Sequence, residues 1–466
     1  RIREQVEETA KTLGGRPDLD EDLLDEVTAL NEWPMPIAGS FDEAFLDVPH
    51  EALVATMKGN QKYFPVFNPA GRLLNHFITI VNLESTQPDL IREGNERVVR
   101  PRFADAKFFW EQDGKQRLEE RIPQLDHVVF QSALGNMREK SGRVATLAAH
   151  IADKIGGDPQ LALRAGELSR CDLMTEMVFE FPEMQGIMGR YQAQRDGEPE
   201  ELAEAMDEFY MPRFSGDRLP QTPTGIAISL ADRLDTLVGI FGIGMKPTGD
   251  KDPFALRRAA LGALRVLRDH ALPLNLKALL AEAEEQLHGR LRQSKVADAV
   301  YDFMLERLKG LYADDGTAHD VFEAVAAVEP TSIADFEHRV RAVSDFRALA
   351  EAEALAAANK RISNILRKAE GPIAETVDPD LFELTAEKEL YDQLQAIDRQ
   401  ITPMLADANY GAMLQALARL RAPVDRFFDD VMVMAEKQSV RANRLAMLRS
   451  LGQQFLRVAD VSELRT

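Results

Sequence analysis

The stretch from Thr222 to Leu267 constrains the fold more than any other part of the sequence, because it specifies two helices and the turn between them. Apolar side chains recur every fourth residue from Ile226 to Val238, which is the spacing of a helix with one buried stripe. Four glycines and a proline follow between residues 239 and 249 and end that helix in a loop. Asp252-Pro253 has the form of an N-cap with proline at the first helical position. A second helix is therefore predicted to begin near Phe254.

The start of that second helix carries charges of both signs. Lys251, Arg257 and Arg258 lie close to a helix N-terminus, where backbone N–H groups and the helix dipole favour anions, so an RNA phosphate could dock there. Asp250 and Asp252 bring negative charge to the same place, and Asp252 is able to cap the helix itself. The loop also lacks the G-x-x-x-x-G-K-[ST] arrangement of a P-loop. Two interpretations stay open, an RNA or subunit contact and a purely structural turn.

Length and composition bound the class of protein. A chain of 466 residues is too long for one compact core, so we expect two to four domains. The sequence has neither an apolar run of roughly 20 residues nor a secretory signal, so no membrane partner is expected. Its single cysteine excludes a disulfide framework and fits a reducing compartment, which predicts a cytoplasmic protein. Because the chain begins at Arg1, inside an expected helix, we also expect an N-terminal portion to be missing.

The net charge limits the partners further. A formal charge of −21 at pH 7 repels phosphate and argues against a protein that coats nucleic acid non-specifically. Any RNA contact must come from local basic patches, and no DNA partner is expected.

The apolar pattern predicts a mainly α, multidomain fold. Residues 1–124 are expected to form an α+β part with a small sheet. Its strands are predicted at Leu53–Thr56, Tyr63–Val66 and Phe77–Val81, and a hairpin turn at Asn68–Arg72. From Leu125 onward the spacing becomes helical. We divide this helical part into domains at residues 125–271, 272–332 and 333–466.

One cluster in the α+β part combines cations with aromatic rings. Lys58, Lys62, Tyr63 and Phe64 would suit the stacking of unpaired nucleotides. A lysine-edged strand with aromatic core residues is the other interpretation, and from the residues alone it is favoured, since such clusters are common on ordinary sheets.

A second basic cluster lies in the C-terminal domain. Lys360, Arg361, Arg367 and Lys368 occur within nine residues without an acid between them, and Asn359 and Asn364 add groups able to read base edges. A solvated basic helix face is the competing interpretation.

The last helical stretch carries three arginines with different expected roles. Arg444 falls within the apolar stripe, so it must be paired, and Asp429 or Asp430 is the predicted partner. Arg441 and Arg449 lie nearer the edge of the stripe and are candidates for phosphate contact.

Several long strings resemble one family. They are EGNERVVRPRFADAKFFWEQD from Glu93, CDLMTEMVFEFPEMQGIMGRYQA from Cys171, KPTGDKDPFALRRA from Lys246, NKRISNIL from Asn359 and the final segment from Ala422. They are similar, in order, to strings of the beta subunit of bacterial heterotetrameric glycyl-tRNA synthetase. The last two resemble its DALR-type anticodon-binding domain, a helical bundle.

This resemblance implies an α2β2 ligase that attaches glycine to tRNA(Gly) at the expense of ATP. The activation site, with its ATP and Mg, is expected on the alpha subunit, so this chain is expected to hold no catalytic residue and no cofactor. The partners implied are the alpha subunit and tRNA(Gly). We predict that the following residues bind tRNA: Lys360, Arg361, Asn364, Lys368, Arg441, Arg449, Lys58 and Lys62.

The resemblance also implies a degenerate HD-type domain. HD-type hydrolases hold a metal with a histidine, an adjacent His-Asp pair and a later aspartate, and the matching positions here are His150, Cys171-Asp172 and Asp232. A softer sulfur in place of the pair's histidine damages a site for Mg, Mn or Fe, so no metal is expected. Two alternatives are an HD-type phosphohydrolase and a non-catalytic RNA-binding module.

Overall fold

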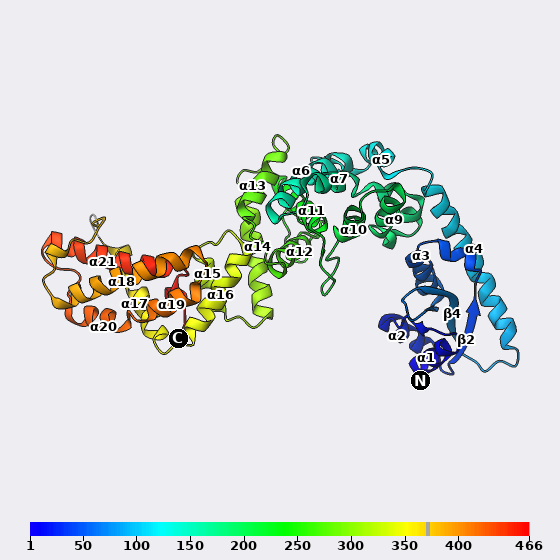
Figure 1. The fold of residues 1–466 in the computed structure, drawn as a ribbon, viewed down its shortest axis with the longest axis horizontal. Coiled ribbons are helices and arrows are strands. Elements are labelled where there is room, and N and C mark those ends of the chain that lie inside the picture. Colours follow the sequence, from blue (N-terminus) through cyan, green and yellow to red (C-terminus); the bar gives the residue numbers. More distant parts are fainter. Residues whose placement is uncertain (370–372, 466) are drawn as a thin grey trace. The chain divides into compact units, whose positions relative to one another are not determined.

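A computed structural model describes residues 1–369 and 373–465, and helices dominate it (Figure 1). The chain divides into two compact units, Arg1–Asp232 and Arg233–Thr466. The predicted mainly α, multidomain fold is confirmed, whereas the finer division into four domains stays a prediction. No helix in the described residues is long and apolar enough to cross a membrane.

The first unit begins with a four-stranded antiparallel sheet. Its strand order is β1-β3-β4-β2, with β1 at Arg16–Pro17, β2 at Met35–Ser40, β3 at Phe64–Phe67 and β4 at Leu73–Val81. The predicted strands at residues 63–66 and 77–81 and the hairpin between them are confirmed, although β4 begins earlier, at Leu73.

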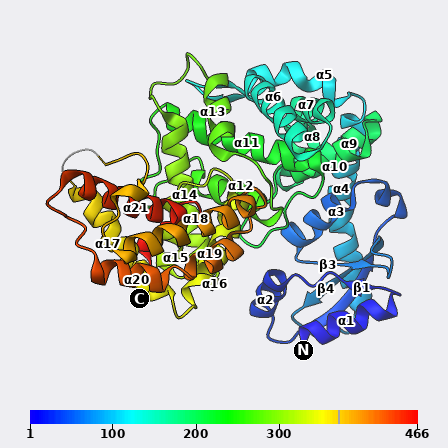
Figure 2. The same ribbon diagram turned by 60° about the vertical axis from the view of Figure 1, so that its left-hand side comes forward.

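Successive side chains of a strand point to opposite faces, so this sheet is buried on both sides. Ile78 packs with α1 (Ile2–Thr12) and α2 (Glu21–Leu30), which lie beside the sheet in Figure 2. Phe77 joins a second cluster under the long helix α4 (Pro88–Asp113), which contributes Phe103. A Cβ atom on Gly39 would lie 2.3 Å from the Phe77 ring, so only glycine fits there.

The predicted strand at Leu53–Thr56 is wrong. These residues belong to α3 (His50–Ala55) and to the π-helical turn η2 (Thr56–Asn60). Leu53 and Met57 are buried four residues apart, about one helical turn. In a short apolar run this pattern cannot be distinguished from that of a buried strand.

The rest of the first unit is helical except for a two-stranded ribbon of β5 (Val129–Gln131) and β6 (Gly135–Asn136). An Asn136–Glu139 capping box begins α6 (Met137–Ile155), and Gly156, with φ +79°, ends it. The helices are α5 (Leu118–Arg121), α6 (Met137–Ile155), α7 (Pro159–Leu168), α8 (Glu176–Glu180), α9 (Ile187–Asp196), α10 (Glu200–Glu208) and the first half of α11 (Pro223–Gly242).

The second unit is built from helices. After the end of α11, its helices are α12 (Leu256–Asp269), α13 (Leu276–Gln286), α14 (Val296–Asp314), α15 (His319–Ala326), α16 (Ile333–Arg347), α17 (Ala352–Lys368), α18 (Thr385–Ala406), α19 (Tyr410–Ala418), α20 (Arg421–Asp430) and α21 (Gln438–Leu456). Helices α17 to α21 lie together in both views (Figures 1 and 2).

Residues after α21 close this bundle against helices much earlier in the chain. The Asp460 N–H donates to the Ala324 carbonyl at 2.8 Å, and the Arg465 N–H donates to Asp320 Oδ2 at 2.9 Å. Arg339 on α16 donates to the carbonyls of Arg457 and Val458.

Candidate nucleic-acid interface

Helix α17 buries one side and presents cations on the other. Leu355, Asn359 and Ile362 are buried, whereas Lys360, Arg361, Arg367 and Lys368 lie outside that buried stripe. This follows from the 3.6-residue helical period, since the cations fall between the apolar positions.

These four cations differ from their neighbours in having no acidic partner in the part of the chain that the structure describes. The same bundle pairs Arg339 with Asp335, Arg426 with Glu389, and Arg457 with Asp398. Among the described residues, no carboxylate lies within 4.0 Å of Lys360, Arg361, Arg367 or Lys368. Helix α17 is therefore a local positive surface on an acidic chain.

Packing fixes part of this surface. The Arg361 guanidinium lies 4.2 Å from the centre of the Phe428 ring on α20, a cation–π contact. Arg367 Nη2 donates to Asn364 Oδ1 at 2.7 Å, which orients both side chains. Asn359 cannot read a base, because its buried amide donates to the Leu355 carbonyl at 2.9 Å.

A polar hollow of about 750 Å³ adjoins the helix. One wall is formed by Lys360, Ser363, Asn364 and Arg367, and residues of the segment Asp460–Arg465 form the other. The volume is in the range of small-ligand sites, and the hollow carries charges of both signs, since its second wall includes Asp460 and Glu463.

The three arginines of α21 have separate roles. Arg444 is buried as predicted, but the predicted partners are wrong. Its Nε lies 2.7 Å from Glu387 Oε1 on α18, because Asp429 and Asp430 are exposed at the end of α20. Its Nη1 also donates to the Met432 carbonyl at 2.8 Å.

Arg449 and Arg441 lie at the edge of the α21 stripe. Arg449 Nη2 donates to the carbonyls of Ala374 and Glu375 at 2.6 and 2.9 Å, so it holds the segment that follows α17. Arg441 is half-buried and has no acidic partner among the described residues. The predicted phosphate contact is therefore more accessible at Arg441 than at Arg449.

The aromatic cluster of the first unit is structural. Tyr63 and Phe64 are buried, and Tyr63 stacks on Phe77 with ring centres 4.5 Å apart. Lys58 Nζ lies 2.7 Å from Asp18 and Lys62 Nζ lies 2.8 Å from Glu26. A tRNA contact at either lysine would have to replace an existing ion pair.

Asp252, at the end of the glycine-rich turn, caps the helix that follows. Helix α12 begins at Leu256, two residues later than predicted, and Asp252 accepts hydrogen bonds from the Leu256 and Arg257 N–H groups at 2.8 and 2.9 Å. The Arg257 guanidinium donates to the Gly249 carbonyl at 2.5 Å. These bonds satisfy N–H groups that an anion would need, which favours the structural interpretation.

The four HD-type positions do not form one ligand set. His150 is exposed on α6, whereas Cys171 and Asp172 are buried. Asp232 on α11 accepts two cations: Lys140 Nζ lies 3.1 Å from its Oδ1, and Arg170 pairs with the same atom. Sequence reasoning missed both Lys140 and Arg170, because nothing in their local pattern marks them as inward-pointing.

These residues do not fit a catalytic metal. Burial raises the pKa of the Cys171 thiol to about 12, so it is not the thiolate that a metal binds. Lys140 and Arg170 already neutralise Asp232. No group of three or more His, Cys, Asp and Glu side chains able to hold a metal occurs within residues 1–369 and 373–465.

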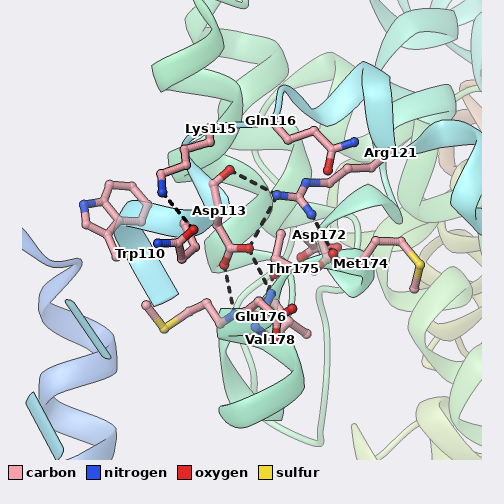
Figure 3. A network of polar contacts seen from close by, with 12 residues as sticks. Trp110, Asp113, Lys115, Gln116, Arg121, Asp172, Met174, Thr175, Glu176 and Val178 are labelled. Atoms are coloured by element: carbon pink, nitrogen blue, oxygen red, sulfur yellow. Dashed lines mark hydrogen bonds and ion pairs between the residues drawn. The ribbon is translucent and has the colours of Figure 1, made fainter. Parts of the chain in front are cut away.

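A further polar network joins α4 to the helical part of the first unit (Figure 3). Asp113, at the end of α4, accepts hydrogen bonds from the Glu176 and Met177 N–H groups, both at 2.9 Å, and so caps α8. Arg121 Nη2 lies 3.4 Å from Asp113 Oδ1, and its Nη1 donates to the Met174 carbonyl at 2.6 Å. Burial raises the pKa of Asp113, and the two N–H groups and Arg121 oppose that rise.

Comparison with known proteins covers the whole chain. A family model described as "Glycyl-tRNA synthetase beta subunit" matches residues 1–327, and the model "DALR anticodon binding domain" matches residues 355–460. The glycine–tRNA ligase beta subunit of Pasteurella multocida (strain Pm70) is 52% identical over 464 residues, which are 100% of this chain and 67% of that protein. The same-named protein of Salmonella arizonae is 52% identical over 465 residues, covering 100% of this chain and 68% of the relative.

Proposed function

The chain belongs to the family of glycyl-tRNA synthetase beta subunits, and from this we propose that it binds tRNA(Gly) for the ATP-dependent attachment of glycine. The partner is the alpha subunit, in an α2β2 assembly. ATP and Mg act at an activation site on that subunit, so this chain contributes tRNA binding and no catalytic residue.

The observation that supports this function is the cationic face of α17, which has no acidic partner among residues 1–369 and 373–465 and lies within the DALR-matched region. Phosphate contacts give affinity, and side-chain amides or stacked guanidinium groups can add base recognition in single-stranded loops. Lys360, Lys368 and Arg441 supply charge. Asn364 and Arg361 supply an amide and an oriented guanidinium plane.

The test is equilibrium binding of three RNAs across a salt series: the glycine tRNA, the same tRNA with a swapped anticodon, and an unrelated tRNA. We expect a preference for the glycine tRNA that falls when the anticodon is changed. The double variant Lys360→Glu/Arg361→Glu should bind more weakly, and its salt slope should be smaller by roughly one for each phosphate that it no longer binds.

A charge reversal elsewhere in the bundle is the matched control. Arg399 is exposed on α18, and its Nε donates to the Gln395 carbonyl of the same helix at 3.2 Å, so Arg399→Glu changes the net charge without altering α17. Equal losses of affinity in Arg399→Glu and in the single variants Lys360→Glu and Arg361→Glu would show a general charge effect. Unchanged binding in both single variants of α17 would remove that helix from the interface.

A further inference from the structure

A second hollow, of about 520 Å³, lies in the first unit, remote in sequence from the DALR-matched region. Four parts of the chain line it: residues 46–50, which lead into α3, the β3–β4 hairpin, and one residue each of α4 and α9. The lining residues are Leu46, Asp47, Val48, Pro49, His50, Asn68, Gly71, Arg72, Leu73, Trp110 and Tyr191.

Two aromatic rings form one wall and are held in place by neighbouring side chains. Trp110 and Tyr191 meet edge to face, with ring centres 6.1 Å apart. The Arg195 guanidinium lies 3.5 Å from the centre of the Trp110 ring and donates to the Trp110 carbonyl at 3.1 Å. The Tyr191 hydroxyl donates to Glu51 Oε2 at 2.9 Å. The wall is therefore built before any ligand arrives.

The Asp113 network described above fixes the helix that carries Trp110. Asp113 lies one turn after Trp110 on α4, and Figure 3 shows both residues. Because Asp113 is bonded to α8 and to Arg121, the end of α4 cannot rotate without breaking buried hydrogen bonds.

The rest of the hollow combines an apolar floor with a polar rim. Val48, Pro49 and Leu73 are buried, whereas the Arg72 side chain is exposed on the hairpin. Among the described residues, Arg72 has no acidic partner within ion-pair distance, and Asn68 lies beside it in the lining. Asn68 Oδ1 accepts the Arg72 N–H at 3.0 Å, which leaves its NH2 group for a ligand, and Asp47 adds one carboxylate to the rim. The rings and the Arg72 guanidinium are the groups that recognise a base and its phosphate.

We propose that this hollow binds the base of an unpaired nucleotide against the Trp110–Tyr191 wall, with Arg72 facing its phosphate. The choice of RNA as the source of that nucleotide rests on the proposed function. The fit of the hollow to a nucleotide is independent of that function, because a free nucleotide presents the same base and phosphate groups.

Tryptophan emission gives a direct readout, because the chain has only two tryptophans. In the full chain carrying Trp33→Phe, Trp110 is the sole indole, and a base stacked on it should quench its emission. We would titrate this protein with glycine tRNA, with a five-nucleotide single-stranded RNA and with AMP. Anisotropy of labelled tRNA, read in parallel, reports whether tRNA is bound at all.

We expect saturable quenching by tRNA and by the short RNA. Trp110→Leu should weaken binding of a labelled short RNA by about 5- to 150-fold, the value of one base–aromatic stack, and Trp110→Phe should restore most of it. Arg72→Glu tests the same site without altering the buried wall, and Lys11→Glu, at an exposed site on α1, is its charge-matched control.

The outcomes separate this proposal from the proposed function. Bound tRNA with unchanged Trp110 emission, and no quenching by the short RNA or AMP, would overturn the nucleotide site and leave the tRNA function standing. Quenching by AMP but not by either RNA would support the nucleotide chemistry and assign it to a free nucleotide. If anisotropy shows no tRNA binding, the proposed function fails. The titrations with the short RNA and with AMP then still test whether the hollow binds a nucleotide.

Discussion

The carboxyl group of Asp172 lies wholly inside the first unit and titrates in an accessible range. Burial raises its pKa to about 6, against the opposing effects of the Gly186 N–H and of Arg170. The Gly186 N–H donates to Oδ2 at 2.6 Å, whereas Oδ1 is buried with no hydrogen-bond partner among the described residues. The folded protein therefore favours the protonated carboxyl more than the unfolded chain does, where the carboxyl keeps its ordinary pKa of 3.8.

The sign of the pH effect follows from this order of pKa values. A carboxyl whose pKa is higher in the folded state binds its proton more tightly there, so the stability it contributes is fully present below pH 3.8. That contribution disappears as the pH rises through about 6. On acidification from pH 7.5 to pH 5 the free energy of unfolding should rise by about 1 kcal/mol, and the full difference of pKa corresponds to about 3 kcal/mol.

Asp172→Asn removes this titration while keeping a carbonyl oxygen for the Gly186 N–H. Both tryptophans, Trp33 and Trp110, belong to the first unit, so denaturant unfolding followed by their emission reports on that unit. On going from pH 7.5 to pH 5, the free energy of unfolding of the wild type should rise by about 1 kcal/mol relative to that of the variant, and the comparison cancels other titrating groups.

Two results would refute the reasoning about Asp172. If the difference between wild type and variant is the same at both pH values, the carboxyl is not titrating between them. If the wild type loses stability relative to the variant on acidification, the folded pKa lies below the unfolded one and the buried carboxylate is stabilised as an anion.

Three further outcomes are expected. Glu387→Ala leaves the Arg444 guanidinium buried without its carboxylate and should lower the free energy of unfolding by about 3–5 kcal/mol. Denaturant unfolding followed by circular dichroism measures this loss, and an unchanged unfolding midpoint would rule out the pairing. Asp113→Ala removes the cap of α8 and the partner of Arg121, so it should lower the free energy of unfolding by about 3 kcal/mol, more than Asp113→Asn does. Denaturant unfolding followed by tryptophan emission measures both losses, and equal losses would mean that the charge of Asp113 does not contribute. Cys171, with its pKa raised to about 12 by burial, should react with iodoacetamide at pH 8 about a thousandfold more slowly in native protein than in denaturant, and rapid native labelling would contradict its burial.

Features that depend on the spacing of residues along one helix or strand were predicted well from the sequence. The stripe around Arg444 identified a buried, paired arginine, and turn residues located the hairpin after Phe67. The predicted partner of Arg444 was wrong because Glu387 lies 57 residues earlier, on another helix, and spacing along one helix says nothing about what packs against it.

The same limit explains the candidate sites. The cations of α17 were found because they adjoin one another in the sequence, and the structure places them outside the buried stripe of one helix. Trp110, Tyr191 and Arg72 come from three separate elements, so no local pattern joins them. Lys140 and Arg170 likewise meet Asp232 only through the packing of helices, and sequence reasoning about the HD-type positions had no means of seeing that the site holds its own cations.

The closure of the C-terminal bundle has a consequence for how the chain is synthesised. Asp320 on α15 receives the Arg465 N–H, 145 residues later, and Arg339 finds its carbonyl partners 118 or 119 residues later. At roughly 5–20 residues per second, a ribosome takes about 7–29 s to translate the longer of these intervals. During that time α15 and α16 lack the segment that bonds to Asp320 and Arg339, so the bundle cannot close until residues 457–465 have been made.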